Sequence, residues 1–160
     1  MALIKADAER RDPQHRQPLV VLLDGALGLW RLAPQLFKPW KRVTCVLDIM
    51  HVVGYLWAAA NALFGEASQA GKHWVQRKLT EMLRGRVGYV IGGLRHILTT
   101  QRLRQSVRQT LAKVITFFHN PRRWMKYDVY LAAGLPVGTG VVESACGSVV
   151  KHRMAGEGQR

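Results

Sequence analysis

The sequence predicts an α/β fold that is mostly helical. Two short apolar runs, PLVVLL at 18–23 and RVTCVL at 42–47, have the length and the β-branched content of strands. Between and after these runs, apolar residues recur every three or four positions, which is typical of helices. The chain has 160 residues, 48% of them hydrophobic and 21% charged, so we expect a domain with a real core rather than a disordered chain.

The expected elements follow one another in a simple order. Residues 1–17 are polar and charged and are expected to form a loop or a frayed helix end. A helix over 26–37 connects the two strands, and Pro34 is expected to kink it or end it. The pattern is again helical over 49–64, and nearly all of the chain beyond it is helical. The later helices are expected at 66–84, 86–98 and 101–119, then from Pro121 to a cap at Gly134, and after the loop LPVGTG.

This order divides the chain into three parts. Residues 1–51 carry the two strands, residues 52–134 are helical, and residues 135–160 contain a glycine loop and a terminal helix that carries Glu143. Two strands alone do not make a stable sheet that is buried on both faces. The chain is therefore expected either to be mostly helical with a small β element or to belong to a larger domain.

The charge of the chain favours a polyanionic partner. A formal net charge of +14 results from 24 Lys and Arg against 10 Asp and Glu, and nucleic acid is the commonest partner of such proteins. A basic protein without such a partner, or one attracted to an anionic membrane, would explain the charge as well. The longest apolar run, within 52–64, is too short for a membrane span of roughly 20 residues. We expect a cytoplasmic protein with no membrane partner, in which Cys45 and Cys146 are reduced, buried thiols.

An acid follows each of the two predicted strands. Asp24 ends the first apolar run, and Asp48 ends the second, with His51 three residues later. Taken alone, each acid is best explained as the N-cap of the next helix, and His51 as its hydrogen-bond partner. Parallel strands joined by one crossover helix, however, end at the same edge of a sheet, where open α/β sheets bind ligands. The two acids together therefore indicate a site.

Glu143 is a third candidate acid. It lies in the first turn of the last predicted helix, where a carboxylate also interacts favourably with the helix dipole. Carboxylates that converge suit Mg²⁺, and two such ions about 4 Å apart support phosphodiester cleavage. Asp24, Asp48 and Glu143 are thus candidate acids of such a site.

Three segments, VVLLDGALGLW, VTCVLDIMHVVGYLWAAANALFGE and GLPVGTGVVESACGSVVKHRM, resemble bacterial insertion-sequence transposases of the DDE class. They are most similar to the Kra-type family, which is related to the Mutator-like group. The resemblance implies an RNase H-like fold with a large all-helical insertion before the last catalytic helix. It also implies that Asp24 and Glu143 are the second and third catalytic acids and bind the metal, so we expect their carboxylates to lie within roughly 8 Å of each other. Asp48 and His51 would form the D-x-x-H motif of such families.

The chain departs from the pattern of that family in three places. The first catalytic Asp and the first three strands have no counterpart, Gly147 stands where a basic residue is usual, and the chain stops before a typical tryptophan. We therefore expect a C-terminal transposase fragment with two core strands, which binds DNA in the bacterial nucleoid but is inactive in catalysis. The full-length enzyme would use two Mg²⁺ ions, and this chain would bind either these ions or none. A homo-oligomer is a further alternative, in which a partner copy would supply the missing acid.

The densest cluster of basic residues is the expected contact with the DNA backbone, although a solvated helix face explains any one of them equally well. Its members are Arg102, Arg104, Arg108, Arg122, Arg123 and the neighbouring Trp124. The alternative function is a non-catalytic, basic helical protein that binds nucleic acid. A third alternative is a decayed remnant that does not fold stably, since missing strands would expose the edge beside 18–23 to aggregation.

Overall fold

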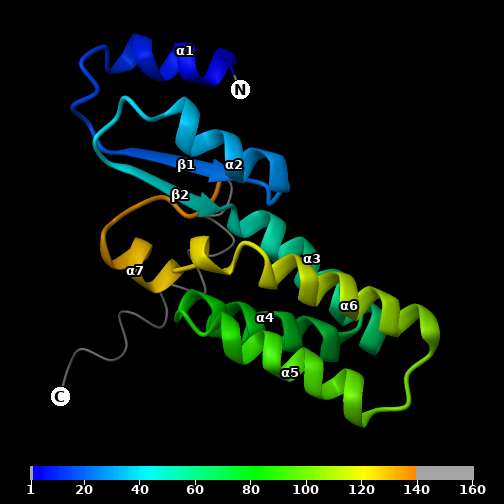
Figure 1. The fold of residues 1–160 in the computed structure, drawn as a ribbon. Coiled ribbons are helices and arrows are strands. Elements are labelled where there is room, and N and C mark those ends of the chain that lie inside the picture. Colours follow the sequence, from blue (N-terminus) through cyan, green and yellow to red (C-terminus); the bar gives the residue numbers. More distant parts are fainter. Residues whose placement is uncertain (1, 140–160) are drawn as a thin grey trace, which may run out of the picture.

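The computed structural model describes residues 2–139 and confirms a mostly helical α/β fold (Figure 1). Within these residues there are seven α-helices, one 3₁₀ helix and two strands. In chain order they are α1 (Ala2–Arg11), β1 (Leu19–Leu23), α2 (Leu27–Leu36), β2 (Val43–Leu47), α3 (Ile49–Phe64), α4 (Gln69–Leu83), α5 (Val87–Thr100), α6 (Gln105–His119), η1 (Arg122–Trp124) and α7 (Tyr127–Ala132).

The two strands form a parallel pair connected by α2. Their register runs from Leu19 opposite Val43 to Leu23 opposite Leu47. Burial increases along both strands: Leu23 and Leu47 at the carboxyl ends are buried, whereas the residues at the amino ends are only half-buried. In β1, Val21 and Leu23 are buried on one face, whereas Val20 and Leu22 on the other face are half-buried.

Helices α3 to α6 form a four-helix bundle next to the strands. Each helix packs against the next one along the chain, and α6 returns to pack against α3 (Figure 1). The apolar face of α6 lies in this core, where Leu111, Val114 and Phe118 are buried. Within residues 2–139, no helix has both the length and the apolar composition that a membrane span requires.

The outer edge of β2 is covered by η1 and α7. The Tyr127 hydroxyl donates a hydrogen bond of 2.8 Å to the carbonyl oxygen of Leu47, and the Tyr130 hydroxyl donates a longer one of 3.5 Å to Cys45. The predicted continuous helix from Pro121 is wrong, because the chain leaves helical geometry between η1 and α7. Met125 and Tyr127 are both buried while Lys126 is exposed, and this alternation turns Tyr127 toward the strand.

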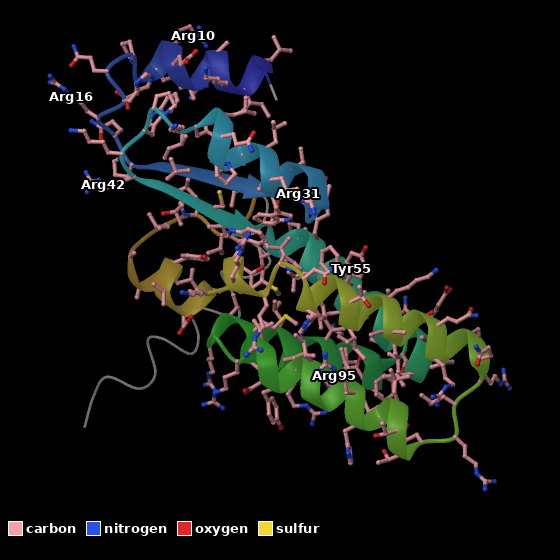
Figure 2. All side chains as sticks on the ribbon, in the orientation of Figure 1. Arg10, Arg16, Arg31, Arg42, Tyr55 and Arg95 are labelled. Atoms are coloured by element: carbon pink, nitrogen blue, oxygen red, sulfur yellow. The ribbon has the colours of Figure 1, made fainter. Side chains whose placement is uncertain are left out.

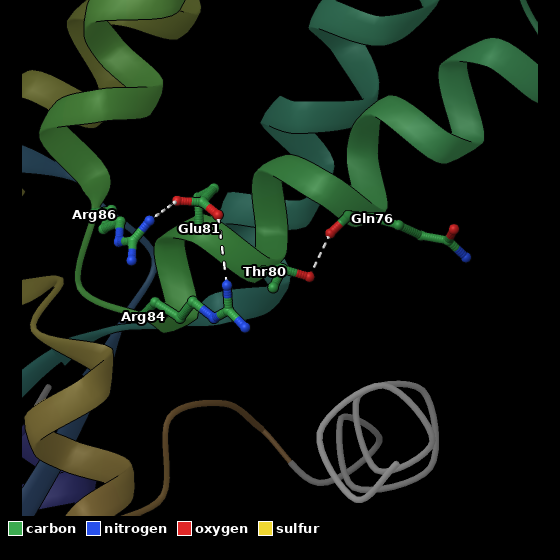
Figure 3. A network of polar contacts seen from close by, with 5 residues as sticks. All are labelled: Gln76, Thr80, Glu81, Arg84 and Arg86. Carbon is green, nitrogen blue, oxygen red and sulfur yellow. Dashed lines mark hydrogen bonds and ion pairs between the residues drawn. The ribbon is translucent and has the colours of Figure 1, made fainter. Parts of the chain in front are cut away.

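The corner between α4 and α5 contacts α7. Figure 3 shows Glu81 between two arginines, at 3.9 Å from Arg84 and 3.2 Å from Arg86, which hold the two ends of the corner together. Gly85 has a φ of 74°, and a Cβ atom there would lie 2.6 Å from the carboxylate of Asp128 in α7. The bundle and the element that covers β2 therefore meet at a glycine that no larger residue could replace without a shift.

The amino-terminal segment is a helix rather than the expected loop or frayed end. In α1, Lys5 pairs with Glu9 at 3.2 Å, and Asp7 pairs with both Arg10 at 2.6 Å and Arg11 at 2.8 Å. Pairs at these spacings stabilise an exposed helix by a few tenths of a kcal/mol each, roughly. The sequence-based expectation overlooked them because the segment has no apolar stripe.

Candidate functional site

Asp24 and Asp48 lie at the same edge of the sheet, as predicted for parallel strands. They directly follow Leu23 and Leu47, the last paired residues of the two strands. The backbone N–H of Asp48 extends the ladder by one step, since it donates to the carbonyl oxygen of Leu23 at 2.8 Å. Neighbouring strands lie about 4.8 Å apart, so the two acids are neighbours across the ladder.

The carboxylate of Asp48 is buried and has a partner at each oxygen. Its side chain is the N-cap of α3 and accepts a hydrogen bond from the backbone N–H of Met50 at 2.9 Å. Its second oxygen accepts a hydrogen bond from the Thr139 hydroxyl at 3.0 Å. The N-cap interpretation of Asp48 is confirmed, and the residue also ties a distant loop to the start of α3.

The carboxylate of Asp24, by contrast, is exposed. One oxygen accepts a hydrogen bond from the backbone N–H of Ala26 at 2.9 Å, which forms a tight turn before α2. The N-cap position of α2 is Ala26 itself, so the N-cap interpretation of Asp24 is wrong. Its other oxygen has no hydrogen-bond partner among residues 2–139. Asp24 is therefore the acid at this edge that keeps a carboxylate oxygen available for a ligand.

The turn after Asp24 depends on Gly25. This residue has a φ of 96°, which glycine adopts without the steric penalty of other residues. A Cβ atom there would lie 2.6 Å from the ring of Phe117 in α6. Gly25 thus allows the bundle to approach the carboxyl end of β1 closely.

The glycine loop before Glu143 reaches the same edge. The backbone N–H of Ile49 donates to the carbonyl oxygen of Val137 at 2.9 Å, and the next contact along the loop is the one between Thr139 and Asp48. Glu143 itself lies outside the described residues, and so do Cys146 and Gly147.

His51 lies on the exposed side of the first turn of α3. Among the described residues its ring makes no hydrogen bond to Asp48; only its backbone N–H does so, to the Asp48 carbonyl oxygen at 3.1 Å. The expectation of a side-chain pair is therefore wrong. The ring lines an open depression of about 350 Å³ together with Met50, Gly54, Tyr55 and Ala58.

Tyr55 separates this depression from a second one of about 520 Å³. The Tyr55 ring stacks on the ring of Phe117 with 3.6 Å between centroids and an interplanar angle of 9°. Figure 2 shows Tyr55 where the α/β part meets the bundle. The second depression is also lined by Gly25, Ala112, Lys113, Thr116, Asn120 and Pro121. Sequence reasoning missed these residues, because their proximity to Gly25 depends on how α6 packs against α3.

The described residues do not complete a metal site. Within 2–139, no group of three or more His, Cys, Asp or Glu side chains is placed to hold a metal ion. Magnesium in proteins is often held by one or two carboxylates together with water molecules. Asp24 has a carboxylate oxygen suitable for this role, and Glu143 is the candidate for the second ligand.

The predicted basic residues fall into two groups rather than one cluster. Arg102, Arg104 and Arg108 lie at the start of α6, and Arg122, Arg123 and Trp124 lie beyond its end. The 15 residues of α6 span about 22 Å, which separates the two groups. Their contact with DNA stays a prediction.

Three of these six side chains, those of Arg108, Arg123 and Trp124, already have partners in the fold. Arg108 donates to the carbonyl oxygen of Leu98 at 2.9 Å and so fixes the connection between α5 and α6. Trp124 stacks on Trp30 of α2 at 4.0 Å, with the guanidinium of Arg123 3.9 Å from its ring centre. These contacts give the three side chains a structural role that the sequence did not reveal.

Cys45 is a free thiol in the middle of β2. It is half-buried, and burial raises the pKa of its thiol while the nearby Arg123 acts in the opposite direction. A raised pKa keeps the thiol protonated and unreactive.

The chain was compared with protein-family models, curated proteins and solved structures, and none of them matches it.

Proposed function

We propose that this chain is a DNA-binding fragment of a DDE-class insertion-sequence transposase and that its sheet edge carries two of the three metal-binding acids. In this proposal, β1 and β2 correspond to two strands of an RNase H-like core, and α3 to α6 belong to the helical insertion. The observation that carries the proposal is the hydrogen bond between Thr139 and Asp48, because it brings the segment leading to Glu143 to the edge that holds Asp24.

Each acid has a distinct role in this proposal. Asp24 and Glu143 would bind Mg²⁺, which neutralises charge on the phosphate and activates the attacking oxygen in phosphodiester chemistry. Asp48 would position the loop through Thr139 and would not bind the metal directly, since both of its oxygens have partners. The fragment, which lacks the first catalytic acid of the family pattern, would bind DNA in the bacterial nucleoid without transferring strands.

Magnesium-dependent DNA binding tests the proposal. The affinity of the parent protein for a short DNA duplex should increase when Mg²⁺ replaces EDTA at constant ionic strength. Asp24→Ala or Glu143→Ala should remove this increase, with Mg²⁺ affinity falling by at least about tenfold. Glu66→Ala is a matched control, because Glu66 is an exposed acid between α3 and α4. Fluorescence anisotropy measures DNA binding, and circular dichroism verifies that each variant is folded.

A non-catalytic nucleic-acid-binding protein is the second candidate. It is favoured by the full engagement of Asp48 in helix capping and loop anchoring, which is a purely structural role. On this hypothesis DNA binding is salt-sensitive, and Mg²⁺ has the same effect on the parent, on Asp24→Ala and on Glu143→Ala. That outcome of the titration would contradict the transposase proposal and leave DNA binding intact.

A further inference from the structure

The two outer edges of the sheet differ. In the parallel ladder, Leu19 donates to Arg42 at 2.9 Å and Leu23 accepts from Asp48 at 2.8 Å, so the backbone groups of residues 19, 21 and 23 point toward β2. The N–H and C=O groups of Val20 and Leu22 consequently point away from it.

These outward groups lack partners. No hydrogen bond within the described part of the chain reaches the backbone of Val20 or Leu22 on this side. On the other side of the sheet, hydroxyls from α7 occupy the outward carbonyls of Cys45 and Leu47. Within residues 2–139, α7 thus covers the edge of β2, whereas no group forms hydrogen bonds with the edge of β1.

The sequence of β1 does nothing to protect that edge. LVVLL contains no charged residue and no proline, which are the usual means of preventing an edge strand from pairing with another chain. An extended segment can add to such an edge through main-chain hydrogen bonds.

We propose that the occupant of this edge is a second copy of the chain, paired antiparallel through β1 about a two-fold axis at Val21. In this register Val20 lies opposite Leu22 of the partner subunit, and Leu22 opposite the partner's Val20. All of these residues carry outward groups, so each opposed pair exchanges both of its hydrogen bonds. The strand is therefore complementary to itself, which a two-fold interface requires.

The charges at the strand ends agree with this direction of pairing. Figure 2 shows Arg16 near the amino end of β1, and Asp24 is exposed at its carboxyl end. Antiparallel pairing brings the amino end of one β1 beside the carboxyl end of the other. The partner subunit's Arg16 would then lie near Asp24, and the four-stranded sheet would have tyrosine-capped β2 strands at both of its edges.

A pair of proline variants tests the interface. Val20→Pro removes an outward N–H from β1, whereas Val43→Pro removes an outward N–H from β2; proline is tolerated at such positions of edge strands. The parent and Val43→Pro should sediment as dimers in analytical ultracentrifugation after nuclease treatment. Val20→Pro should raise the dimer dissociation constant by at least about tenfold. A monomeric parent, or a dimer that Val20→Pro does not weaken, would overturn the proposal.

A cysteine cross-link tests the register without relying on a disruptive variant. The two-fold axis places Val21 opposite the partner's Val21 in a non-hydrogen-bonded pair, with Cα atoms about 4.5 Å apart. Val21→Cys, combined with Cys45→Ser and Cys146→Ser, should form a disulfide-linked dimer on mild oxidation. Leu3→Cys, on the exposed face of α1, is the matched control and should remain reduced. Equal cross-linking of both variants would contradict the proposed register.

Salt separates this proposal from the proposed function. Two copies of a chain with a net charge of +14 repel each other, so added salt should tighten the dimer. DNA binding should weaken under the same conditions. A dimer that dissociates with added salt would indicate a nucleic-acid bridge instead, whatever the outcome of the Mg²⁺ titration.

Discussion

The hydroxyl of Tyr127 shows how much one polar atom can contribute to this fold. It is fully buried and satisfies a backbone carbonyl of β2 that no strand pairs with. The Tyr130 hydroxyl makes a similar contact with Cys45, but at 3.5 Å, the outer limit of a hydrogen bond. Two residues of one type, three positions apart, therefore make unequal contributions.

Replacing each tyrosine with phenylalanine should show this difference. Tyr127→Phe leaves a buried carbonyl without a partner, so the free energy of unfolding should fall by about 1–3 kcal/mol. Tyr130→Phe removes only a long contact and should cost less than about 0.5 kcal/mol. Urea denaturation of the two variants measures both values, and equal losses would contradict the explanation.

Tyr127 also makes stability depend on alkaline pH. Burial raises the pKa of its hydroxyl well above the ordinary value, and the nearby carboxylate of Asp48 acts in the same direction. A raised folded-state pKa stabilises the protein fully below the unfolded pKa of about 10, and this stabilisation is lost as the pH rises beyond it. The urea midpoint of the parent should therefore fall more steeply than that of Tyr127→Phe between about pH 9 and pH 11. Parallel curves would contradict this prediction.

At Asp24 and Asp48 the sequence was sufficient to predict the position but not the environment. The common edge follows from the parallel connection, which two apolar runs and an intervening helix pattern indicate. Which of the two acids is buried depends on Thr139, 91 residues away along the chain. No local pattern reveals such a contact, so the exposure of Asp24 and its availability to a ligand could not be predicted.

Among the elements, α3 has a capped amino end and an exposed glycine in its interior. Asp48 caps it, and Val52, Leu56 and Ala59 form its buried face. Gly54 lies on the exposed side with no atom near its absent Cβ, in contrast to Gly25 at the end of β1. The two glycines should therefore respond in opposite ways to the same substitution.

Alanine substitution at these two positions is a matched test. Gly25→Ala would place a methyl group against Phe117 and force a non-glycine residue to a φ of 96°, which should cost about 2–4 kcal/mol of stability. Gly54→Ala should stabilise the protein by about 0.5–1 kcal/mol, because alanine favours a helix interior. Thermal unfolding gives both signs, and a neutral Gly25→Ala would contradict the close approach of α6.

Element boundaries were predictable where the apolar spacing is regular and unpredictable where tertiary contacts interrupt it. Residues 49–64 form α3 as expected, because the stripe is continuous and ends at Gly65. The segment after Pro121 has helical composition but divides into η1 and α7, because Tyr127 is drawn toward β2. Pro34 does not end α2, because the helix continues to Leu36. Pro34 lies in its last turn and is exposed.

At the scale of the whole molecule, the basic side chains surround an apolar core. The four-helix bundle and the strand pair share one continuous core, whereas nearly all arginines are exposed. The class of fold could be predicted from composition and periodicity, whereas a polyanionic partner stays a prediction from the net charge. The arrangement of the basic residues could not be predicted, because α6 separates the arginines at its start from Arg122 and Arg123 beyond its end.

The salt dependence of DNA binding can distinguish arginines that contact phosphate from arginines that stabilise the fold. Arg102→Ala and Arg104→Ala should each reduce the slope of log K against log salt by about 0.9 if the residue neutralises one phosphate. Arg108→Ala should mainly lower the melting temperature, because its side chain holds the carbonyl oxygen of Leu98. Anisotropy titrations at several salt concentrations measure the slopes. An unchanged slope in both variants would exclude this end of α6 from the interface.

The contact between Gly85 and Asp128 has a consequence for how the molecule opens. Because the α4–α5 corner rests against α7, and α7 in turn covers β2, the helices and the strands are connected at an exposed junction in addition to the core that they share. Amides on both sides of that junction are therefore expected to exchange with deuterium in one cooperative event.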